Sequence, residues 1–355
     1  MVLDELLKNE GSWLASPAGS DPLSGIIVSS RIRLARNLEG VAFPGWAGEE
    51  ECVRIQARVW DTLGALPCLA PCLSLDMAEL SPMDREFLRE RHLISHDLAR
   101  KSRGSGVVIR QDEALGVMVN EEDHLRLQAM RPGFQLPALW EEISTLDNEL
   151  EKRVPFAFSA TLGYLTSCPT NVGTGLRASV MVHLPGLRLI RELDPIIKGL
   201  TKIGLAVRGL QGEGTEASGN MFQISNQTTL GESESVIIER LIQIVGEVAQ
   251  HESNARARLL EQRRPMVEDY VGRAYGVLRH ARLLVSQEAL DLLSALRLGC
   301  EIGMIKGLDI AGVNRLILLA MPGHLQKSEG RTIPPDERDQ VRARLVGETV
   351  RQAAL

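Results

Sequence analysis

The sequence predicts an α+β protein: an antiparallel sheet flanked by helices, followed by an all-helical C-terminal region. Two observations predict this class. Before about residue 231, short β-prone runs follow one another across tight turns, and the helices are grouped around them instead of alternating with single strands. After residue 231, apolar residues recur at helical spacing to the end of the chain, punctuated by glycines and Pro322. We therefore expect a boundary between two domains at residues 254–265.

The expected elements of the first part follow from the spacing of its apolar residues. Ser81 can cap one helix, with Asp84 and Glu86 in its first turn, and Pro67 and Pro71 break the chain before it. The expected helices are residues 4–14, 46–63, 81–100, 137–153 and 191–202. The expected strands are residues 26–30, 106–110, 115–120, 124–130, 178–184, 205–210 and 221–225.

The second part begins with a long helical pattern at residues 232–262 that has few helix breakers. No internal repeat and no low-complexity tract occurs along the chain. The further helices that we expect are residues 267–278, 286–298, 311–319 and 335–354.

Composition limits the class of function. The 355 residues carry a net charge of −6 without a strongly polycationic segment, which argues against nucleic acid as a direct partner. No run of eighteen apolar residues and no signal-peptide pattern occurs, so we expect no membrane span and no export. The five cysteines are irregularly spaced, and no second Cys/His pair completes a zinc site with Cys68 and Cys72. We expect reduced thiols in a cytoplasm.

One stretch of the first part combines several chemically useful residues. Residues 166–181, TSCPTNVGTGLRASVM, contain Cys168, Gly173, Gly175 and Arg177. The glycines permit a positive φ or a close backbone approach, so backbone N–H groups could face an anion, and the Arg177 guanidinium could bind phosphate. Considered alone, the stretch is better described as a surface loop that leads into a buried strand.

Two further segments bring arginine to the end of a strand. Arg31 and Arg33 are two residues apart, so in a strand they share a face, where two cations repel unless water or an anion separates them. A solvated strand face is the commoner case, and a polyphosphate clamp is the functional alternative. Residues 120–126, NEEDHLR, form either an ordinary surface turn or a site in which a carboxylate binds a cationic substrate and Arg126 meets phosphate.

The segment 208–216, RGLQGEGTE, adds Arg208, three glycines and two acids after a strand. It is neither a Walker A loop, since Gly-Lys-Ser/Thr occurs nowhere, nor a G-x-G-x-x-G fingerprint, since residue 217 is Ala. No HRD or DFG motif of protein kinases occurs. Four segments thus place arginine beside a turn, and two of them also supply glutamate. Arginine binds phosphate and glutamate binds a guanidinium bidentately, so an enzyme that joins a phosphoryl group to a guanidinium needs both.

The segments SSRIRLARN, NEEDHLR, CPTNVGTGLRAS and RGLQGEGTEASGNMFQISN resemble, in order and spacing, the catalytic domain of the phosphagen (guanidino) kinases. The chain resembles the bacterial protein-arginine kinases more closely still, because only a short segment precedes Arg31 and because its helical end is similar to their C-terminal domain. The resemblance implies an N-terminal segment (1–25), a phosphagen-kinase-like catalytic domain (26–254), and a helical C-terminal domain (255–355) for dimerisation and phosphoarginine binding.

The resemblance also implies roles for residues. Glu122 and Glu216 would hold the acceptor guanidinium, with Glu121 as the alternative to Glu122, and Cys168 would lie beside it as a thiolate without forming a covalent bond. No protein residue would ligate a metal, since phosphates and water would hold Mg²⁺. His92 is the least secure match, because a histidine on a helix surface is a real alternative. The ATP-binding set would be Ser29, Ser30, Arg31, Ile32, Arg33, His92, Arg126, Arg177, Ala178, Ser179, Val180, Met181, Arg208, Gly209, Leu210, Gln211, Gly212 and Glu213.

A last motif lies in the C-terminal region. Arg338 and Arg342 are four residues apart in an expected helix, with Asp339 beside them, which in physical terms alone favours a salt-bridged solvent face. The run Arg338–Ala343 also matches the RDxxRA motif with which protein-arginine kinases bind phosphoarginine away from the active site. The resemblance therefore implies allosteric feedback by the product through Arg338, Asp339, Arg342 and Ala343.

Taken together, these motifs predict an ATP-dependent protein-arginine kinase of cytoplasmic protein quality control in the stress response. The resemblance implies protein substrates bound through arginine side chains, a heat-shock repressor, a zinc-binding activator protein, a Clp protease that receives the marked proteins, and a homodimer. Two alternatives stay open. One is a phosphagen kinase that acts on free arginine or another small guanidino compound, and the other is a non-catalytic adaptor that binds phosphoarginine.

Overall fold

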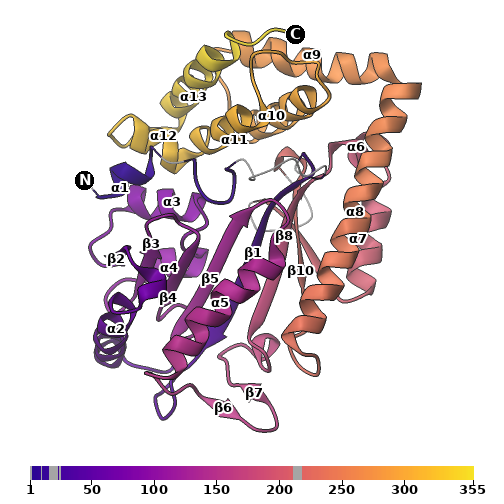
Figure 1. The fold of residues 1–355 in the computed structure, drawn as a ribbon. Helices are drawn as coiled ribbons and strands as arrows, with labels where there is room; N and C mark the ends of the chain where they lie inside the picture. Colours follow the sequence, from indigo (N-terminus) through magenta and orange to yellow (C-terminus); the bar gives the residue numbers. More distant parts are fainter. Residues whose placement is uncertain (1, 9, 16–22, 24, 211–217) are drawn as a thin grey trace.

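The computed structural model describes residues 2–8, 10–15, 23, 25–210 and 218–355. Within these residues the main sheet has eight strands, in the order β2-β3-β4-β5-β1-β8-β10-β9, and every neighbouring pair is antiparallel (Figure 1). The predicted α+β class with a helical C-terminal region is confirmed. The strands are β1 (Ile27–Arg36), β2 (Cys72–Asp76), β3 (Gly106–Arg110), β4 (Leu115–Val119), β5 (Leu125–Pro132), β8 (Leu176–His183), β9 (Leu205–Gly209), β10 (Met221–Asn226), and the separate hairpin β6 (Phe158–Ser159) and β7 (Gly163–Tyr164).

Helices cover the sheet and continue into the C-terminal region. Those of the first part are α1 (Val2–Leu6), α2 (Glu49–Gly64), α3 (Pro82–Glu90), α4 (His96–Arg100), α5 (Leu136–Glu151), α6 (Pro185–Leu189) and α7 (Leu193–Lys202). The later ones are α8 (Glu234–Gln262), α9 (Arg264–His280), α10 (Ser286–Glu301), α11 (Ile310–Leu319), α12 (Pro322–Ser328) and α13 (Pro335–Val350). Short 3₁₀ turns are η1 (Pro67–Leu69), η2 (Pro169–Asn171) and η3 (Ser218–Asn220).

Most expected elements lie where the sequence places them, and the exceptions have local causes. The helix expected at 4–14 ends already at Leu6, and the left-handed φ of 75° at Gly11 does not fit a helix over the rest of that range. The helix expected at 81–100 is divided into α3 and α4, because His92 has a left-handed φ of 57° and Ser95 begins a new helix by accepting a hydrogen bond from the Leu98 N–H. Strand β1 is twice as long as expected, because both of its edges are paired. Strand β2 and the helices α6 and α12 were not expected.

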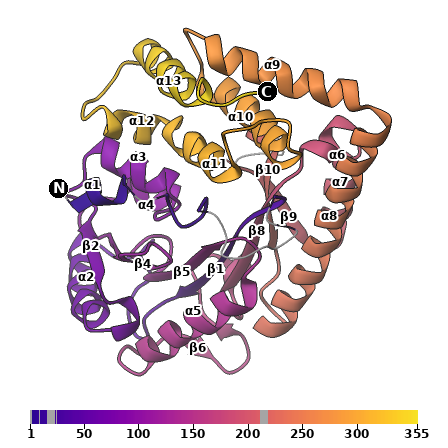
Figure 2. The same cartoon turned by 45° about the horizontal axis from the view of Figure 1, so that its top comes forward.

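The two faces of the sheet have opposite characters. One face carries apolar side chains such as Ile32, Leu127 and Val180, which are fully buried in the main hydrophobic core beneath α5 and α8. The C-terminal helices form a second core around Val271 and Leu293, and this core also includes Met130 and Met181 from the other face of the sheet. The C-terminal helices therefore pack over one end of that second face, as Figures 1 and 2 show.

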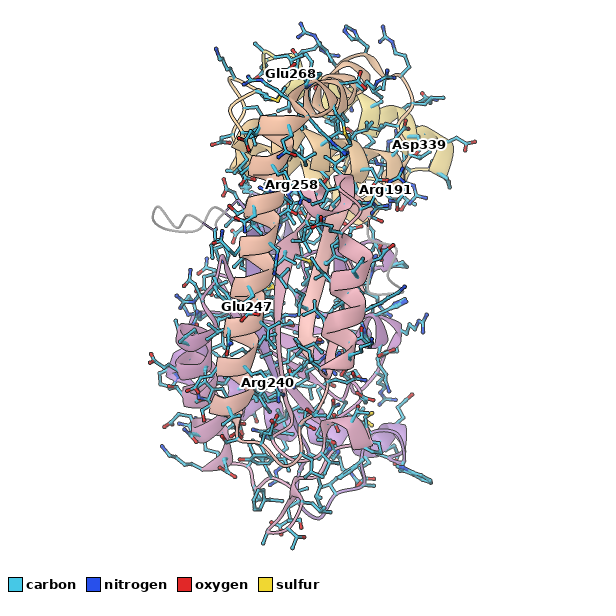
Figure 3. The ribbon with its side chains drawn as sticks, turned by 90° about the vertical axis from the view of Figure 1, so that its right-hand side faces the viewer. Arg191, Arg240, Glu247, Arg258, Glu268 and Asp339 are labelled. Carbon is cyan, nitrogen blue, oxygen red and sulfur yellow. The ribbon has the colours of Figure 1, made fainter. Side chains whose placement is uncertain are left out.

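Helix α8 connects the two regions. Its 29 residues span about 44 Å, and Figure 3 shows Arg240, Glu247 and Arg258 along its length, from the lower part of the sheet to the C-terminal helices. It passes without a break through most of the expected boundary at residues 254–265, and α9 begins at Arg264. Of the helices in the described residues, none combines the length and apolar character that crossing a membrane requires.

Candidate active site

Strand register brings the expected arginines onto one face of the sheet. Arg33 lies directly opposite Arg177, and the residue opposite Arg126 is Ala35, two positions along β1 from Arg33. Residues that are directly opposite, or two apart in a strand, point to the same face. The same alternation continues through β10 to β9. The guanidinium groups on this arginine face belong to Arg31, Arg33, Arg126, Arg177 and Arg208.

Among the described residues, Arg126 of this face has carboxylate partners, whereas Arg31, Arg33 and Arg177 have none. Burial, together with repulsion from Arg126 and Arg177, lowers the pKa of Arg31 to about 10. Burial also holds the pKa of Arg33 well below its usual range, with added repulsion from Arg31, Arg126 and Arg177. The Nε atoms of Arg33 and Arg177 are buried and have no hydrogen-bond partner among the described residues. Because an unpaired buried cation is costly, this face is suited to a multiply charged anion.

Two adjacent carboxylates lie at one end of the arginine face. Glu121 is buried and accepts hydrogen bonds from Ser95 Oγ (2.5 Å), Arg126 Nη1 (2.5 Å) and the Glu122 N–H (3.1 Å). The Glu122 side chain is 39% exposed, and its nearest cation is Arg126 Nη2 at 3.7 Å. Burial raises the pKa of Glu122 above its usual value, although Arg126 opposes the shift. Glu121 is thus fully engaged within the protein, whereas Glu122 is available to a ligand.

A buried clamp fixes the Cys168 loop beside this acidic turn. Asp123 Oδ1 accepts a hydrogen bond from the Ser167 N–H (2.7 Å) and one from Asn37 Nδ2 (2.6 Å). Asn37 Oδ1 accepts in turn from the backbone N–H of residue 124, at 2.9 Å. The end of β1, the β4–β5 turn and the loop before η2 are therefore joined at one point. Neither Asn37 nor Asp123 was predicted to have a role, although Asp123 belongs to the acidic run at residues 120–126.

Cys168 directly precedes η2 and is partly exposed. Its sulfur lies 2.9 Å from Thr170 Oγ1. Burial and repulsion from Arg208 and Arg126 lower the pKa of Arg177, while Cys168 and Glu122 act on the same guanidinium in the opposite direction. The Cys168 thiol and the Glu122 carboxylate therefore both lie near enough to Arg177 to interact with it electrostatically.

The expected nucleotide-binding residues divide between the two faces. Ser29, Ser179 and Met181 share the arginine face and line a narrow pocket of about 10 Å³, room for about one water, together with Arg31 and His92. The remaining expected residues of β1 and β8 alternate to the apolar face, so they could reach a ligand on the arginine face only through their backbones. These residues are Ser30, Ile32, Ala178 and Val180.

Two of the expected nucleotide-binding residues, Ser30 and His92, have surroundings that differ from those expected from the sequence. The Ser30 hydroxyl donates to the Gly133 carbonyl (2.8 Å) and accepts from the Gln135 N–H (3.0 Å), so it serves the fold. His92 lies beyond the C-terminal end of α3 and not on a helix surface. Burial lowers its pKa well below the usual value, with Arg31 contributing, and its Nε2 has no partner among the described residues.

Several expected residues lie elsewhere. Gly209 ends β9 and Leu210 follows it, whereas Gln211, Gly212, Glu213 and Glu216 fall outside the described residues, so their assignments stay predictions. The RDxxRA run is in α13, apart from the arginine face, and Figure 3 labels Asp339 there.

The RDxxRA run is not a simple solvent-exposed face. Arg342 is only 2% exposed and donates to the carbonyls of Ala320 (2.7 Å) and Leu284 (2.6 Å) and to Asp339 Oδ1 (2.6 Å). Arg338 is partly exposed, and no side chain in the described part of the chain pairs with its guanidinium. The run therefore combines one structural arginine with one that is free to bind an anion.

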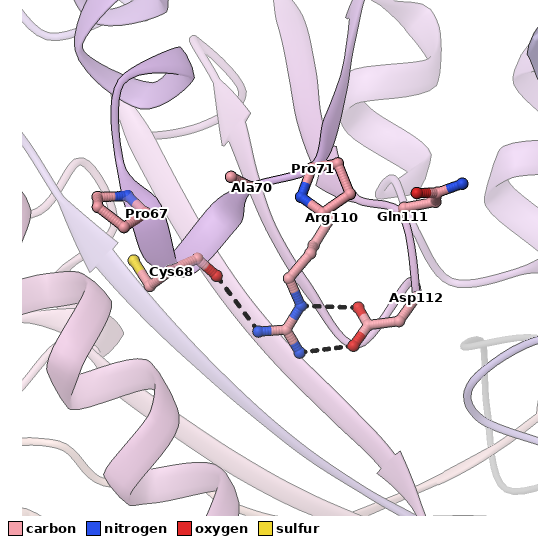
Figure 4. A pocket seen from close by; sticks show the side chains of 7 residues that line it. All are labelled: Pro67, Cys68, Ala70, Pro71, Arg110, Gln111 and Asp112. Atoms are coloured by element: carbon pink, nitrogen blue, oxygen red, sulfur yellow. Dashed lines mark hydrogen bonds and ion pairs between the residues drawn. The ribbon is translucent and has the colours of Figure 1, made fainter.

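A broader hollow of about 640 Å³ lies between η1 and the β3–β4 turn (Figure 4). Its one cation, Arg110, is bonded through Nε and Nη2 to Asp112 at 2.8 and 2.7 Å, and through Nη1 to the Cys68 carbonyl at 3.3 Å. The Arg110 guanidinium also pairs with Glu142 at 2.6 Å. Because this cation is already neutralised, the hollow is a poor phosphate site compared with the arginine face. No cluster of three or more His, Cys, Asp or Glu side chains that could hold a metal occurs in the described ranges.

Comparison with family models divides the chain into two matched parts. The model described as "ATP:guanido phosphotransferase, C-terminal catalytic domain" matches residues 64–255. The model described as "Protein-arginine kinase McsB C-terminal domain" matches residues 264–354.

Similar proteins cover nearly the whole chain. A protein-arginine kinase of Moorella thermoacetica is 48% identical over 345 residues, covering 96% of this chain and 98% of that relative. One from Pelotomaculum thermopropionicum is 46% identical and covers 98% of each chain. Among solved structures, a lombricine kinase is 25% identical with a TM-score of 0.59, covering 68% of this chain and 73% of that one. A duplicated taurocyamine kinase of Schistosoma mansoni with bound transition-state analogue components is 28% identical with a TM-score of 0.60, covering 71% and 38%.

Proposed function

The chain belongs to the protein-arginine kinases of the ATP:guanido phosphotransferase family, and we propose that it transfers the γ-phosphoryl group of ATP to arginine side chains of proteins. The observation that carries the proposal is the arginine face, which ends at the free carboxylate of Glu122 and the thiol of Cys168. A cationic surface for a polyphosphate thus adjoins an acidic position for a guanidinium.

The arginine face would bind and orient the triphosphate. Phosphoryl transfer depends mainly on positioning and on neutralising the charge of the phosphoryl group in flight. The Nε atoms of Arg33 and Arg177 have no partner among the described residues, so both guanidinium groups would keep donor capacity for phosphate oxygens, and Arg126 joins the phosphate side to the acidic turn through Glu121. Removing one such charged donor should cost about 3–4 kcal/mol in the transition state.

The acidic turn would bind the acceptor. A guanidinium is a poor nucleophile because it is protonated at neutral pH, with a pKa above about 12. Glu122 is suited to orient the attacking nitrogen and to accept its proton, because its raised pKa makes it a stronger base than an ordinary glutamate. Glu121 is already held by Ser95 and Arg126, which supports assigning the catalytic role to Glu122. Glu216 would supply the second carboxylate, and the Cys168 thiolate would lie beside the guanidinium without bonding to it.

Mg²⁺ fits this site as a companion of the nucleotide. The arginine face offers cations, and Glu121 is occupied by hydrogen bonds, so phosphate oxygens and water would be its ligands. When bound, the ion would supply further neutralisation of the phosphate charge.

We further propose the cellular setting that the family resemblance implies. The enzyme would act in the cytoplasm, as a homodimer, on a heat-shock repressor and on proteins marked for a Clp protease, with a zinc-binding activator as partner. Phosphoarginine would bind at Arg338, Asp339, Arg342 and Ala343 and regulate activity. The guanidinium of Arg338, which is partly exposed and has no pairing side chain among the described residues, supports this part of the proposal.

Transfer of radiolabelled γ-phosphate from ATP tests the proposed function. Purified enzyme is given an unrelated arginine-rich protein or free arginine, and the acid-labile product is identified. Label on protein arginine supports the proposal. Label on free arginine alone identifies a phosphagen kinase, and absence of ATP turnover identifies an adaptor.

A further inference from the structure

Helix α12 of the C-terminal region is bound at its start by a buried glutamate of the catalytic region. Glu90, the last residue of α3, is 5% exposed. Its Oε1 accepts from the Gly323 N–H (2.7 Å), and its Oε2 accepts from the His324 N–H (2.9 Å) and from His324 Nδ1 (2.7 Å). Figures 1 and 2 both show α12 beside α3.

Gly323 is required at this junction. A Cβ atom there would lie 2.8 Å from Glu90 Oε2 and 2.7 Å from the Phe87 nitrogen. Both distances are shorter than real Cβ contacts, so any larger residue would push the two helices apart. The close approach of backbone to carboxylate therefore depends on both partners, Glu90 and Gly323.

The residue after Glu90, Arg91, also contacts His324, through the other nitrogen of the imidazole ring. Its Nε and Nη2 bind the Glu113 carboxylate at 2.9 and 2.5 Å, and both side chains are 1% exposed. Arg91 Nη1 lies 3.4 Å from His324 Nε2. Since a guanidinium only donates, His324 Nε2 is the acceptor and its Nδ1 carries the proton that Glu90 accepts. Glu90 and Arg91 thus hold His324 between them.

His92 follows directly and faces the proposed nucleotide site. Its left-handed backbone costs about 1–2 kcal/mol, so surrounding contacts must hold it. Gln128 Nε2 donates to the His92 carbonyl (2.7 Å), and the Trp13 ring packs edge-on at 4.6 Å. The His92 side chain lines the narrow pocket with Arg31. The position of this side chain therefore depends on the last residues of α3, which α12 holds in place.

We propose that Glu90 is a positioning residue: by binding the first turn of α12 it fixes His92 beside Arg31 at the arginine face, so that the C-terminal helices set the affinity for ATP. The inference rests on the proposed function of the arginine face as the nucleotide site. Through Glu90, the C-terminal region would influence the binding of ATP, independently of any ligand that this region itself binds.

The junction also connects to the RDxxRA run. Arg342 Nε donates to the carbonyl of Ala320, two residues before α12 begins. A displacement of α13 would therefore be transmitted to the start of α12 and on to Glu90.

The test replaces Glu90 by Gln in the full-length protein. Glutamine keeps the shape but cannot accept all three hydrogen bonds. We measure the Kd of a non-hydrolysable ATP analogue by calorimetry, together with kcat and the KM for an arginine-containing peptide. The Kd should rise roughly five- to tenfold, whereas the peptide KM, and kcat at saturating ATP, should stay within about twofold, since Glu90 touches neither substrate.

Lys327→Met is the matched control. Lys327 makes another link between the same helices, from Nζ to Asp84 Oδ1 at 2.7 Å, but Asp84 lies in the first turn of α3, away from His92. This variant should lower the unfolding temperature and leave the Kd for the analogue unchanged. Gly323→Ala, which disturbs the junction from the α12 side, should raise the Kd as Glu90→Gln does.

Three outcomes would overturn the inference. The first is unchanged analogue binding in both junction variants. The second is an equal loss of binding in Lys327→Met, which would show a general effect of helix docking. The third is a wild-type protein that does not bind the analogue, which would refute the proposed function and this inference with it.

Discussion

Replacing Arg33 by Met should stabilise the free protein while abolishing its affinity for ATP. Arg33 lies opposite Arg177, where Cβ atoms are about 5 Å apart, and two charges about 6 Å apart at an effective dielectric of about 20 repel by about 3 kcal/mol. Partial exposure screens this repulsion, so we expect a gain of about 1 kcal/mol in the free energy of unfolding. For a chain of 355 residues the melting temperature should rise by about 1–2 °C, as measured by calorimetry with and without ATP.

Arg36→Met provides the contrast within the same strand. Arg36 is 1% exposed, points to the opposite face, and binds Asp147 through Nε (3.0 Å) and Nη2 (2.7 Å). Its removal leaves the buried Asp147 carboxylate unpaired, so the free energy of unfolding of this variant should fall by about 3–5 kcal/mol. Destabilisation by Arg33→Met to a similar degree, or ATP binding retained in that variant, would refute the view that the arginine face is held ready for an anion.

Further predictions concern the acceptor side and the regulatory run. Glu122→Gln should reduce transfer by at least about 100-fold with ATP binding intact, and full activity in Glu216→Ala would remove the role assigned to that residue. Because burial raises the pKa of Glu122 and the ionised form is the base, kcat/KM should fall with decreasing pH from a value above the ordinary glutamate pKa of about 4.3. Asp123→Asn should raise the KM for the arginine substrate and change the alkylation rate of Cys168, while ATP affinity stays constant; an unaltered alkylation rate would contradict the clamp. Arg338→Ala should lose the response to added phosphoarginine without losing basal turnover.

The arginine face could be predicted from the sequence because its information is local. Arg31 and Arg33 are two residues apart just after an expected strand, Arg126 lies within an expected strand, and Arg177 immediately precedes another. Alternation along a strand then decides the face that each side chain occupies. By the same rule, Ser29 lies on the arginine face and Ser30 on the apolar face. The motif resemblance alone assigned both residues to ATP binding.

The contacts that support the site could not be predicted, because they join residues far apart in the chain. Asn37 and Asp123 are 86 residues apart, and Glu90 and His324 are 234 apart. Nothing in the local pattern of either partner indicates such pairing. The break at His92 was missed for the same reason, since Gln128 and Trp13 hold its left-handed backbone.

A crystal structure with Mg²⁺, ADP, nitrate and an arginine-containing peptide would test the central claim most directly, since planar nitrate imitates the phosphoryl group in flight. We predict that nitrate accepts hydrogen bonds from the guanidinium groups of Arg33, Arg126 and Arg177, with the peptide guanidinium bound by Glu122. A nucleotide bound away from the arginine face, or a peptide arginine that does not reach Glu122, would contradict the account.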